Sequence, residues 1–306
     1  MKKIIAIVFM VALCAISCNK VNVEKEASDE YVQVSLGIGG EAPTITTSPM
    51  AKADEAVDWY QIQVYSAPIG ETRYNYYGYG FFDNIDNMLI NLKRGFQYKF
   101  VVDMIIDGSA KVYKFCLDDS GWAGISNSFF LSSDEHIRFL GEGYLYTKKD
   151  IYNRPDVDRF YGITEGYVPQ SGGKVTVDMK RVSFGVKVVA KEFTAGQLEV
   201  QIDQAPTIYM DSAKSNEATS VISFNRTEKA YYNTSYSEDI AVNIILVPED
   251  GVRIPLIAQD VPFIRNRMTT IEFYAQEPSQ NKTFIIKADE EWEIGDTIVL
   301  DNYTQN

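Results

Sequence analysis

Cysteine and histidine are scarce in this 306-residue chain, which has three cysteines and a single histidine, His136. A Ser/His/Asp triad is therefore excluded unless His136 is the base, and no Gly-x-Ser-x-Gly sequence supports that role. Within the stretch SSDEHIRFL, we interpret His136 as an ordinary surface or cap residue. We predict that the chain is not an enzyme.

Positive charge is also scarce, because 29 Lys and Arg stand against 42 Asp and Glu and give a formal net charge of −13. No run of Lys and Arg interleaved with aromatic residues occurs, so the attraction to phosphate that nucleic-acid binding requires is missing. With this many carboxylates, a nearby pair of the kind that glycosidases use is expected by chance. The charge balance excludes a nucleic-acid partner.

No cofactor or metal site is predicted. The stretch from Asp83 to Asn87 is only slightly similar to a cation-binding loop, since Ile85 occupies the place of an oxygen ligand. We interpret it as a turn.

Long apolar segments are missing as well. The longest, Ile4 to Leu13, has about half of the roughly 20 residues that a membrane-spanning helix needs, and the lysines before it and small residues after it are the order of a secretory signal. The ending Ala15-Ile16-Ser17-Cys18 resembles a bacterial lipoprotein box. That resemblance implies cleavage between Ser17 and Cys18 and lipid on the Cys18 thiol. The alternative is an ordinary signal cut with an incidental Cys18.

The predicted signal peptide, residues 1–17, removes one cysteine, and lipid blocks Cys18. Only Cys116 then remains in the folded part, where we interpret it as an inert strand residue. No intrachain disulfide is possible, so the fold must be held by burial of a core, which a chain of this length can supply.

Alternating hydrophobicity dominates the rest of the chain. Residues 18–30 are polar and charged and are predicted to form a lipidated tether, after which Val32, Val34, Leu36 and Ile38 alternate with other residues as in a half-buried strand. The same alternation recurs at 60–64, 96–106, 113–117, 198–202 and 242–246. The chain is predicted to be almost entirely β, with one short helix capped at 132–135.

Turn-forming residues divide the strand pattern. Asp107-Gly108 predicts a hairpin with a type I′ turn. We place the domain boundary in the turn-rich segment from Tyr167 to Gly173. After it, the buried phase slips within KVTVDMKRVSFGVKVVA, which indicates a bulge near Lys180-Arg181 or a strand that changes sheets there. The predicted fold is all-β, with two tandem β-sandwiches at 31–172 and 173–306.

The chain resembles the fimbrillin-like family, the type V pilus subunits and their anchor and tip relatives in anaerobic Gram-negative bacteria. The resemblance is carried by the lipoprotein signal, the early strand YVQVSLGI, the linker TTSPMAKADEAVDWYQIQVY, DRFYG and VTVDMKRVSFGVKVVA. It implies two transthyretin-like β-sandwiches and a lipid anchor in the outer membrane, with the chain facing the cell exterior. For polymerising members it also implies a protease cut that removes the first strand.

The first strand is large enough to matter for assembly. Burial of its four apolar side chains at roughly 1.5–3 kcal/mol each contributes about 6–12 kcal/mol, against the about 5–15 kcal/mol that stabilises a whole domain. Its loss would leave an apolar groove, which a strand from a neighbouring subunit, such as Asp296 to Tyr303, could refill by β-augmentation. The alternative is that residues 31–38 are simply the first permanent strand.

The linker at 41–58 departs from the polymerising pattern. The family's cut generally follows an arginine, but the first arginine in this chain is Arg73, and Lys52 is the residue in the right place. Lys52 is therefore the candidate processing site. We prefer an anchor-type or accessory member that keeps its strand and its lipid.

Aromatic residues gather in RYNYYGYGFF, residues 73–82. Tyr74, Tyr76 and Tyr77 are a predicted solvent-facing set for contact with a partner or with sugar rings. The alternative is an edge or interdomain strand with half-covered tyrosines. The leading functional prediction is a lipid-anchored cell-surface structural protein in pilus assembly or adhesion, whose partners are other pilus subunits. The second is a glycan-binding outer-membrane surface lipoprotein that uses these tyrosines.

Overall fold

The computed structural model describes residues 31–42, 57–116, 122–132, 145–147, 151–275, 284–288 and 297–300. Within them, strands are joined by two short α-helices, α2 (Gly108–Lys111) and α3 (Thr227–Tyr232), and one 3₁₀ turn, η2 (Ile85–Asn87). The predicted all-β class is confirmed. No helix in this part of the chain is long and apolar enough to cross a membrane. The helix predicted at 132–135 lies outside the described residues beyond Ser132.

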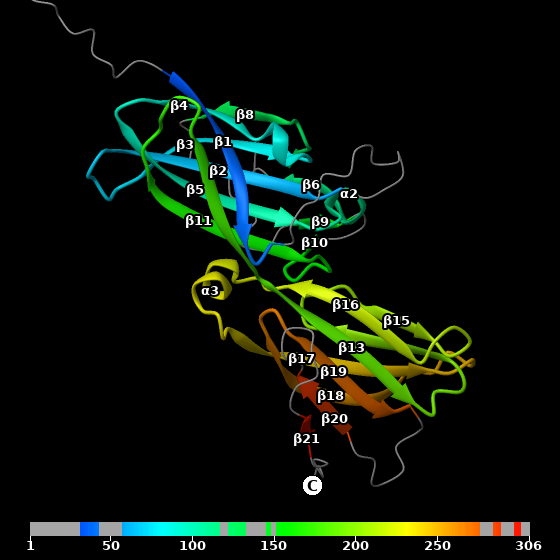
Figure 1. Ribbon diagram of the computed structural model, residues 1–306. Coiled ribbons are helices and arrows are strands. Elements are labelled where there is room, and N and C mark those ends of the chain that lie inside the picture. Colours follow the sequence, from blue (N-terminus) through cyan, green and yellow to red (C-terminus); the bar gives the residue numbers. More distant parts are fainter. Residues whose placement is uncertain are drawn as a thin grey trace, which may run out of the picture.

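Eight strands form sheet A, in the order β4-β1-β12-β11-β5-β2-β3-β8. Their bounds are β1 Tyr31–Gly40, β2 Trp59–Pro68, β3 Asn75–Phe82, β4 Leu89–Lys93, β5 Phe96–Ile105, β8 Ser128–Leu131, β11 Arg159–Tyr167 and β12 Lys174–Arg181. The outermost strands, β4 and β8, approach one another, and the Tyr77 hydroxyl on β3 donates to the Asn91 carbonyl on β4 at 3.0 Å. Sheet A is therefore curled, and strands β4, β1 and β12 enclose one core with strands β5, β2 and β3 (Figure 1).

The alternation in the first strand is confirmed. Val32, Val34 and Leu36 of β1 are buried in this core, while Ile38 is half-buried. They lie with Val175 of β12 and with side chains of the facing strands, because alternate residues of a strand share one face. The other alternating segments named from the sequence lie in β2, β5, β6 (Val112–Cys116), β14 (Gln197–Ile202) and β17 (Ser237–Val247).

The hairpin predicted at Asp107-Gly108 is wrong. Asp107 has the expected left-handed backbone, with φ of 53°, but Gly108 begins α2, and β6 enters a separate sheet instead of pairing with β5. This sheet B has the order β10-β9-β6-β7, with β7 Trp122–Ala123, β9 Leu145–Thr147 and β10 Ile151–Tyr152. A Cβ on Gly108 would lie 2.5 Å from the Cβ of Trp59, so the glycine allows a close approach to β2.

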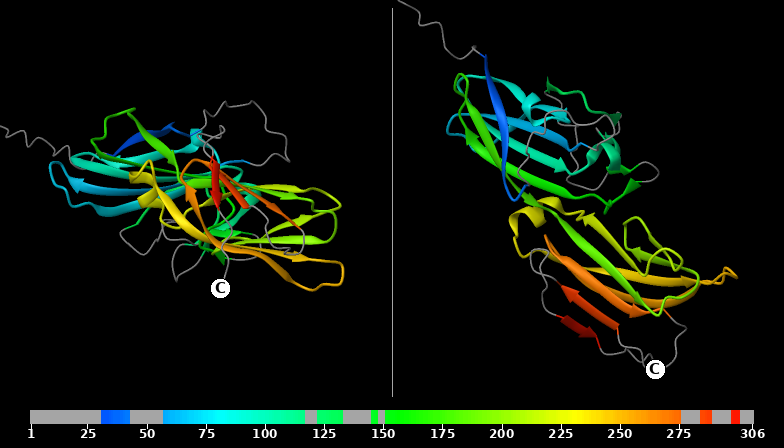
Figure 2. Two further views of the ribbon diagram at one scale, coloured as in Figure 1. Left: turned by 90° about the horizontal axis from the view of Figure 1, so that it is seen from below. Right: turned by 45° about the vertical axis from the view of Figure 1, so that its right-hand side comes forward.

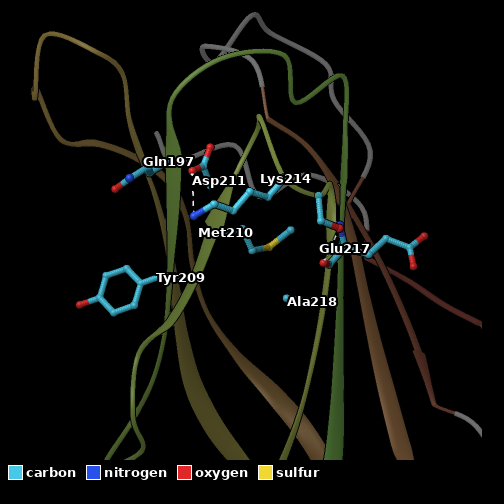
Figure 3. Close-up of a pocket in the computed structure, with 8 residues that line it drawn as sticks. Gln197, Tyr209, Met210, Asp211, Lys214, Glu217 and Ala218 are labelled. Carbon is cyan, nitrogen blue, oxygen red and sulfur yellow. Dashed lines mark hydrogen bonds and ion pairs between the residues drawn. The ribbon is translucent and has the colours of Figure 1, made fainter.

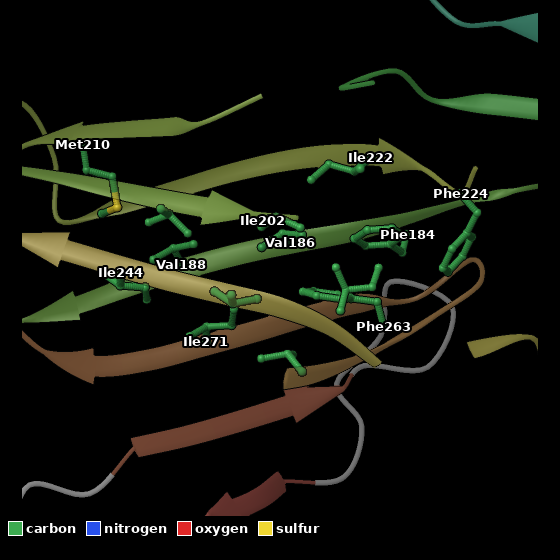
Figure 4. Packing of buried hydrophobic residues seen from close by; sticks show 14 of the residues in the cluster. Phe184, Val186, Val188, Ile202, Met210, Ile222, Phe224, Ile244, Phe263 and Ile271 are labelled. Carbon is green, nitrogen blue, oxygen red and sulfur yellow. The ribbon is translucent and has the colours of Figure 1, made fainter. Parts of the chain in front are cut away.

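Sheets C and D make a second sandwich. Sheet C has the order β16-β13-β19-β20-β21 and sheet D the order β15-β14-β17-β18. Their remaining bounds are β13 Ser183–Lys191, β15 Ile208–Asp211, β16 Glu217–Ser223, β18 Ile254–Ile264, β19 Met268–Tyr274, β20 Phe284–Ala288 and β21 Thr297–Leu300. Their inner faces interdigitate, as where the rings of Phe184 and Phe263 lie 4.5 Å apart between centroids (Figure 4). Figure 2 shows this sandwich at one end of the molecule and sheets A and B at the other.

The chain changes sheets later than the boundary placed at 172/173. The turn-forming residues before Gly173 join β11 to β12 as a hairpin, with the Gly173 amide donating to the Gln170 carbonyl at 2.9 Å. Strand β12 still belongs to sheet A, and after Val182 the chain continues into β13 of sheet C (Figure 1). The phase slip near Lys180-Arg181 thus marks a strand that changes sheets, one of the two readings of the sequence.

A buried ion pair and a short helix lie where the two groups of sheets meet. The Arg159 Nε on β11 donates to Asp103 Oδ1 on β5 at 2.7 Å, and the side chains of both residues are 2% exposed or less. Nearby, α3 sets the ring of Tyr231 against that of Tyr161 with 5.5 Å between centroids. Burial raises the pKa of Asp103, and the Arg159 guanidinium opposes that rise.

Replacing Asp103 by Ala should therefore destabilise the protein by about 3–5 kcal/mol, because it leaves the Arg159 guanidinium buried without its counter-charge. Urea unfolding at pH 7 measures the change. Asp239→Ala, at an exposed position of β17, is the matched control and should shift stability by about 0.5 kcal/mol or less. Equal stability of the two variants would contradict this role of the ion pair.

Candidate functional site

Strand β1 is the feature on which the functional reading depends, and it is an internal strand of sheet A. Its first half pairs antiparallel with β4, from Tyr31 to Ser35, and its second half pairs parallel with β12, from Ser35 to Gly40. The Leu36 amide also donates to the Met88 carbonyl at 3.0 Å. The strand thus fills the space between β4 and β12, and its removal would open a groove lined by apolar side chains.

A carboxylate contact closes the end of this strand. Glu41, directly after β1, receives two hydrogen bonds from Arg265, with Nη1 to Oε2 at 2.7 Å and Nη2 to Oε1 at 3.1 Å. The Arg181 backbone amide donates to the same Oε2 at 3.0 Å. The Arg265 side chain is only 4% exposed, whereas that of Glu41 is 36% exposed. We call Arg265 and the Arg181 amide the carboxylate socket.

The socket joins the two groups of sheets. Arg265 lies in the turn between β18 of sheet D and β19 of sheet C, while Glu41 belongs to the segment that follows β1 of sheet A. Arg265 Nη1 also donates to the Arg181 carbonyl at 2.6 Å, at the end of β12. A single buried guanidinium therefore holds the ends of β1 and β12 against the second sandwich.

Gly40 brings Glu41 to the socket. Its φ is +75°, and a Cβ at this position would lie 2.5 Å from the Met179 carbonyl oxygen on β12. Only glycine adopts this backbone readily at so close an approach. The Glu41 amide then donates to that carbonyl at 2.8 Å, which fixes the direction of the Glu41 side chain.

The electrostatics of the socket favour a charged Glu41. Burial opposes ionisation of the carboxyl, but the hydrogen bonds from Arg265 and from the Arg181 amide outweigh it, so the pKa of Glu41 lies below its ordinary value of 4.5. The Lys180 charge acts in the same direction.

Two further arginines hold the same joint. Arg181 donates through Nε to Asp158 Oδ1 at 2.7 Å and through Nη1 to Asn266 Oδ1 at 3.3 Å. Arg154, between β10 and β11, donates through Nη2 to Glu238 Oε2 on β17 at 2.8 Å. These contacts make the joint a set of arginine–carboxylate pairs, which are stronger than hydrogen bonds between neutral groups.

Several predicted site residues fall outside the described residues. They are Ser17 and Cys18 of the lipidation site, Lys52 and His136. The Cys116 backbone ends β6. Of the proposed donor segment from Asp296 to Tyr303, residues 297–300 are described and form β21, which pairs antiparallel with β20 of the same chain.

The tyrosines of residues 73–82 are not a solvent-facing set. Tyr76 is 7% exposed and stacks edge-on against Tyr65, so its predicted exposure is wrong. The Tyr74 hydroxyl accepts a bond from the Gly166 amide at 3.0 Å, and Tyr77 packs edge-on against Tyr98. Neighbouring strands cover these rings, because the curled sheet A buries most of both faces of β3.

The Asp83–Asn87 stretch is a turn, as predicted. Asn84 caps η2 by accepting the Asp86 amide at 2.8 Å, and Asp83 receives a bond from the Asn127 side-chain amide at 2.7 Å. Among the described residues, no group of three His, Cys, Asp or Glu side chains is arranged to hold a metal ion.

A pocket of about 330 Å³ lies in the second sandwich, at the edge between β15 and β16 (Figure 3). Met210 and Ala218 provide its apolar part, and Asp211 and Lys214 lie at its rim, 3.5 Å apart. Tyr209, also on its lining, is 70% exposed and points outward from sheet D with Gln197 (Figure 3).

The carboxylate socket was missed by sequence reasoning. Glu41 and Arg265 are 224 positions apart, and neither belongs to a motif. The local signal was limited to the Gly-Gly-Glu ending of the first strand pattern, which indicates where a strand ends but not what the acid contacts.

No family model matches the chain, and no curated protein matches it. The solved structures that align with it include the following three. A tip fimbrial protein from Porphyromonas gingivalis aligns with a TM-score of 0.35 and 10% identity, over 84% of this chain and 99% of its own. A fimbrial anchor protein from the same organism aligns with a TM-score of 0.36 and 9% identity, over 87% and 98%. A fimbrial assembly protein from Parabacteroides distasonis aligns with a TM-score of 0.36 and 12% identity, over 88% and 98%.

All three are fimbrial proteins, the class named by the resemblance in the sequence. All three alignments have TM-scores below 0.5 and identities of 12% or less.

The lowered pKa of Glu41 predicts a pH-dependent contribution to stability. Glu41→Gln should lower stability at pH 7 by about 1–2 kcal/mol, a modest loss because the carboxylate is partly exposed. The carboxylate stabilises the fold above its unfolded pKa, and this contribution is lost as pH falls through the lowered folded pKa. The difference between the two proteins should therefore shrink as pH falls below 4.5.

Urea unfolding of wild type and Glu41→Gln across this pH range measures the difference. Glu249→Gln, at an exposed glutamate in the turn after β17, is the control and should match wild type throughout. A wild-type advantage over Glu41→Gln that is constant with pH would contradict an ionised Glu41 in the socket.

Proposed function

We propose that the chain is a lipid-anchored cell-surface structural protein of the fimbrillin-like type, an anchor or accessory subunit that retains its first strand. The observation that carries the proposal is the double attachment of β1, which pairs with β4 and β12 and is held at its end by Arg265. In the sequence, β1 follows directly on the predicted tether of residues 18–30. Lipid on Cys18 would make β1 the element that links the membrane to the folded body.

The direction of the strand suits that role. A pull on the tether acts at Tyr31, along the axis of β1, while the socket holds the opposite end at Glu41. The hydrogen bonds to β4 and β12 run across this axis, so they are loaded together and not one at a time. Such a strand resists extraction along its axis more strongly than one that can be peeled from an edge.

Attachment to other pilus subunits and a location at the outer membrane, facing the cell exterior, belong to the same proposal. Candidate contacts are strand edges, because an unpaired edge accepts another strand. The edge strand β8 carries Phe130 and Leu131, which are 43% and 58% exposed. An apolar edge of this kind favours a protein neighbour.

A cut between residues 43 and 56 tests retention of β1. With a protease recognition sequence placed there, the cut chain on membranes should stay in the membrane fraction, because β1 remains seated and carries the lipid. Membrane sedimentation followed by immunoblotting of the body, from residue 57 onward, measures this. Cys18→Ala is the control and should be soluble before the cut.

Two results would contradict the proposal. Release of the body into the soluble fraction, or a ladder of subunits resistant to dissociation after the cut, would make β1 a strand that leaves. A Cys18→Ala protein that still sediments with membranes and takes up labelled palmitate would refute the lipid anchor.

Glycan binding remains a second candidate function, now on a different surface. Tyr209 on β15 is the most exposed large apolar side chain among the described residues, and it pairs directly with Glu199 on β14, which Arg253 holds by bonds of 2.9 and 2.6 Å. An exposed tyrosine ring beside fixed polar groups and the Gln197 amide suits stacking on a sugar ring. Tyr74, Tyr76 and Tyr77 are not part of this candidate.

Tyr209→Ala should abolish binding on a glycan array without lowering the melting temperature by more than a few degrees. Tyr232→Ala, which removes a tyrosine 66% exposed on α3, is the matched control and should bind as wild type. Absence of glycan binding by the wild type would remove this function.

A further inference from the structure

The pocket between β15 and β16 adjoins the exposed ring of Tyr209. Tyr209 and Asp211 lie on the outer face of β15, while Met210 between them belongs to the core, because alternate residues of a strand point to opposite faces. All three residues line the pocket. A ligand ring that lies on Tyr209 therefore has the pocket directly beside it and can place one substituent there.

The floor of this pocket is apolar. Met210 is only 4% exposed, and the half-buried Ala218 packs against the same core. A hydroxyl pressed against these two side chains would lose its hydrogen bonds to water without gaining others, which is unfavourable. A methyl group gains from the same contact, because its apolar surface leaves water. The floor therefore favours a substituent that ends in a methyl group.

The rim offers a hydrogen-bond acceptor beside a donor. Asp211 and Lys214 lie above Met210 and Ala218, with Oδ2 and Nζ 3.5 Å apart (Figure 3). That separation is long for a charge-assisted hydrogen bond, and the Lys214 side chain is 82% exposed, so the ammonium can turn to a ligand without losing a strong contact. An amide has one N–H donor and one C=O acceptor, which match the carboxylate and the ammonium.

The charges of the lining are balanced. Its three charged residues all belong to the described part of the chain, and each has a counter-charge: Asp211 has Lys214, and Glu217 has Lys187 at 3.0 Å. An acidic or a basic substituent would therefore meet no unpaired charge of opposite sign. The lining favours an uncharged ligand.

We propose that the pocket binds the acetamido group of an N-acetylated amino sugar whose ring stacks on Tyr209. The acetamide N–H donates to Asp211, its carbonyl accepts from Lys214, and its methyl group lies on the apolar floor. The volume of about 330 Å³ is near the lower end of the roughly 300–1,000 Å³ of small-molecule sites, which suits one sugar unit. This inference rests on the second candidate function, glycan binding at Tyr209, and names the class of sugar.

A glycan array tests the inference on the full chain. It carries N-acetylglucosamine and N-acetylgalactosamine beside counterparts in which a hydroxyl or an amine replaces the acetamide. The wild type should bind the acetamido sugars about tenfold or more tightly than either counterpart, since hydrogen bonds to two charged groups are lost without the amide. Lys214→Ala should reduce this preference to about twofold or less. Lys229→Ala, at an exposed lysine of α3, is the matched control and should keep it.

Filling the floor is a second, independent test. Ala218→Leu should exclude the acetamide methyl group and remove the preference, while sugars that only stack on Tyr209 still bind. A melting temperature within a few degrees of the wild type verifies that this half-buried substitution leaves the fold intact. Lys214→Ala alters an exposed side chain and tests the rim without touching the core.

The outcomes separate this inference from glycan binding itself. Equal binding of acetamido sugars and their counterparts would refute the acetamido site while glycan binding stands. Tighter binding of the amine or of an acidic sugar would contradict an uncharged ligand. A preference that survives both Lys214→Ala and Ala218→Leu would place the acetamide outside this pocket. Absence of any glycan binding by the wild type would remove the second candidate function and this inference with it.

Discussion

The contact between Glu41 and Arg265 is the interaction on which the arrangement of the two groups of sheets depends. A guanidinium that is 4% exposed must be paired, because the cost of removing its charge from water is recovered only by a carboxylate in good geometry. Arg265 comes from the turn between β18 and β19, and Glu41 from the end of β1. The pairing of one buried charge thereby sets the position of the first strand relative to the second sandwich.

The same rule operates along the rest of the joint. Arg154 pairs with Glu238 across the sheets, Arg181 pairs with Asp158 beside the socket, and Arg159 pairs with Asp103 inside sheet A. Apolar contacts such as Tyr161 against Tyr231 add area, but they have no preferred direction. Hydrogen-bonded charge pairs do, and the pairs of Arg265 with Glu41 and of Arg181 with Asp158 are bidentate, so the arginines give the joint a defined geometry that burial alone would not provide.

The strands were predictable because the residues that specify each strand are adjacent in the sequence. The joint was not predictable, because the residues that form it are far apart in the sequence. Alternation at Val32, Val34 and Leu36 reports directly on one face of one strand, and the structure confirms it. Gly108 was misread because close approach to Trp59 and a positive φ both call for glycine, and the sequence does not separate them. Gly172 likewise indicated a turn correctly, but the domain boundary placed there was wrong. A turn within a hairpin and a turn between domains use the same residues, so the sequence does not distinguish them.

The proposed retention of β1 depends on a competition between an attached strand and a free one. While the segment 43–56 is intact, β1 is present at an effective concentration in the millimolar range, so a free strand of equal affinity at micromolar concentration fills the groove about a thousandfold less often. Cutting that segment removes the advantage but not the contacts, since Val32, Val34 and Leu36 remain buried and Glu41 remains paired. A cut is therefore necessary for exchange but not sufficient, because the contacts that survive it still hold β1 between β4 and β12.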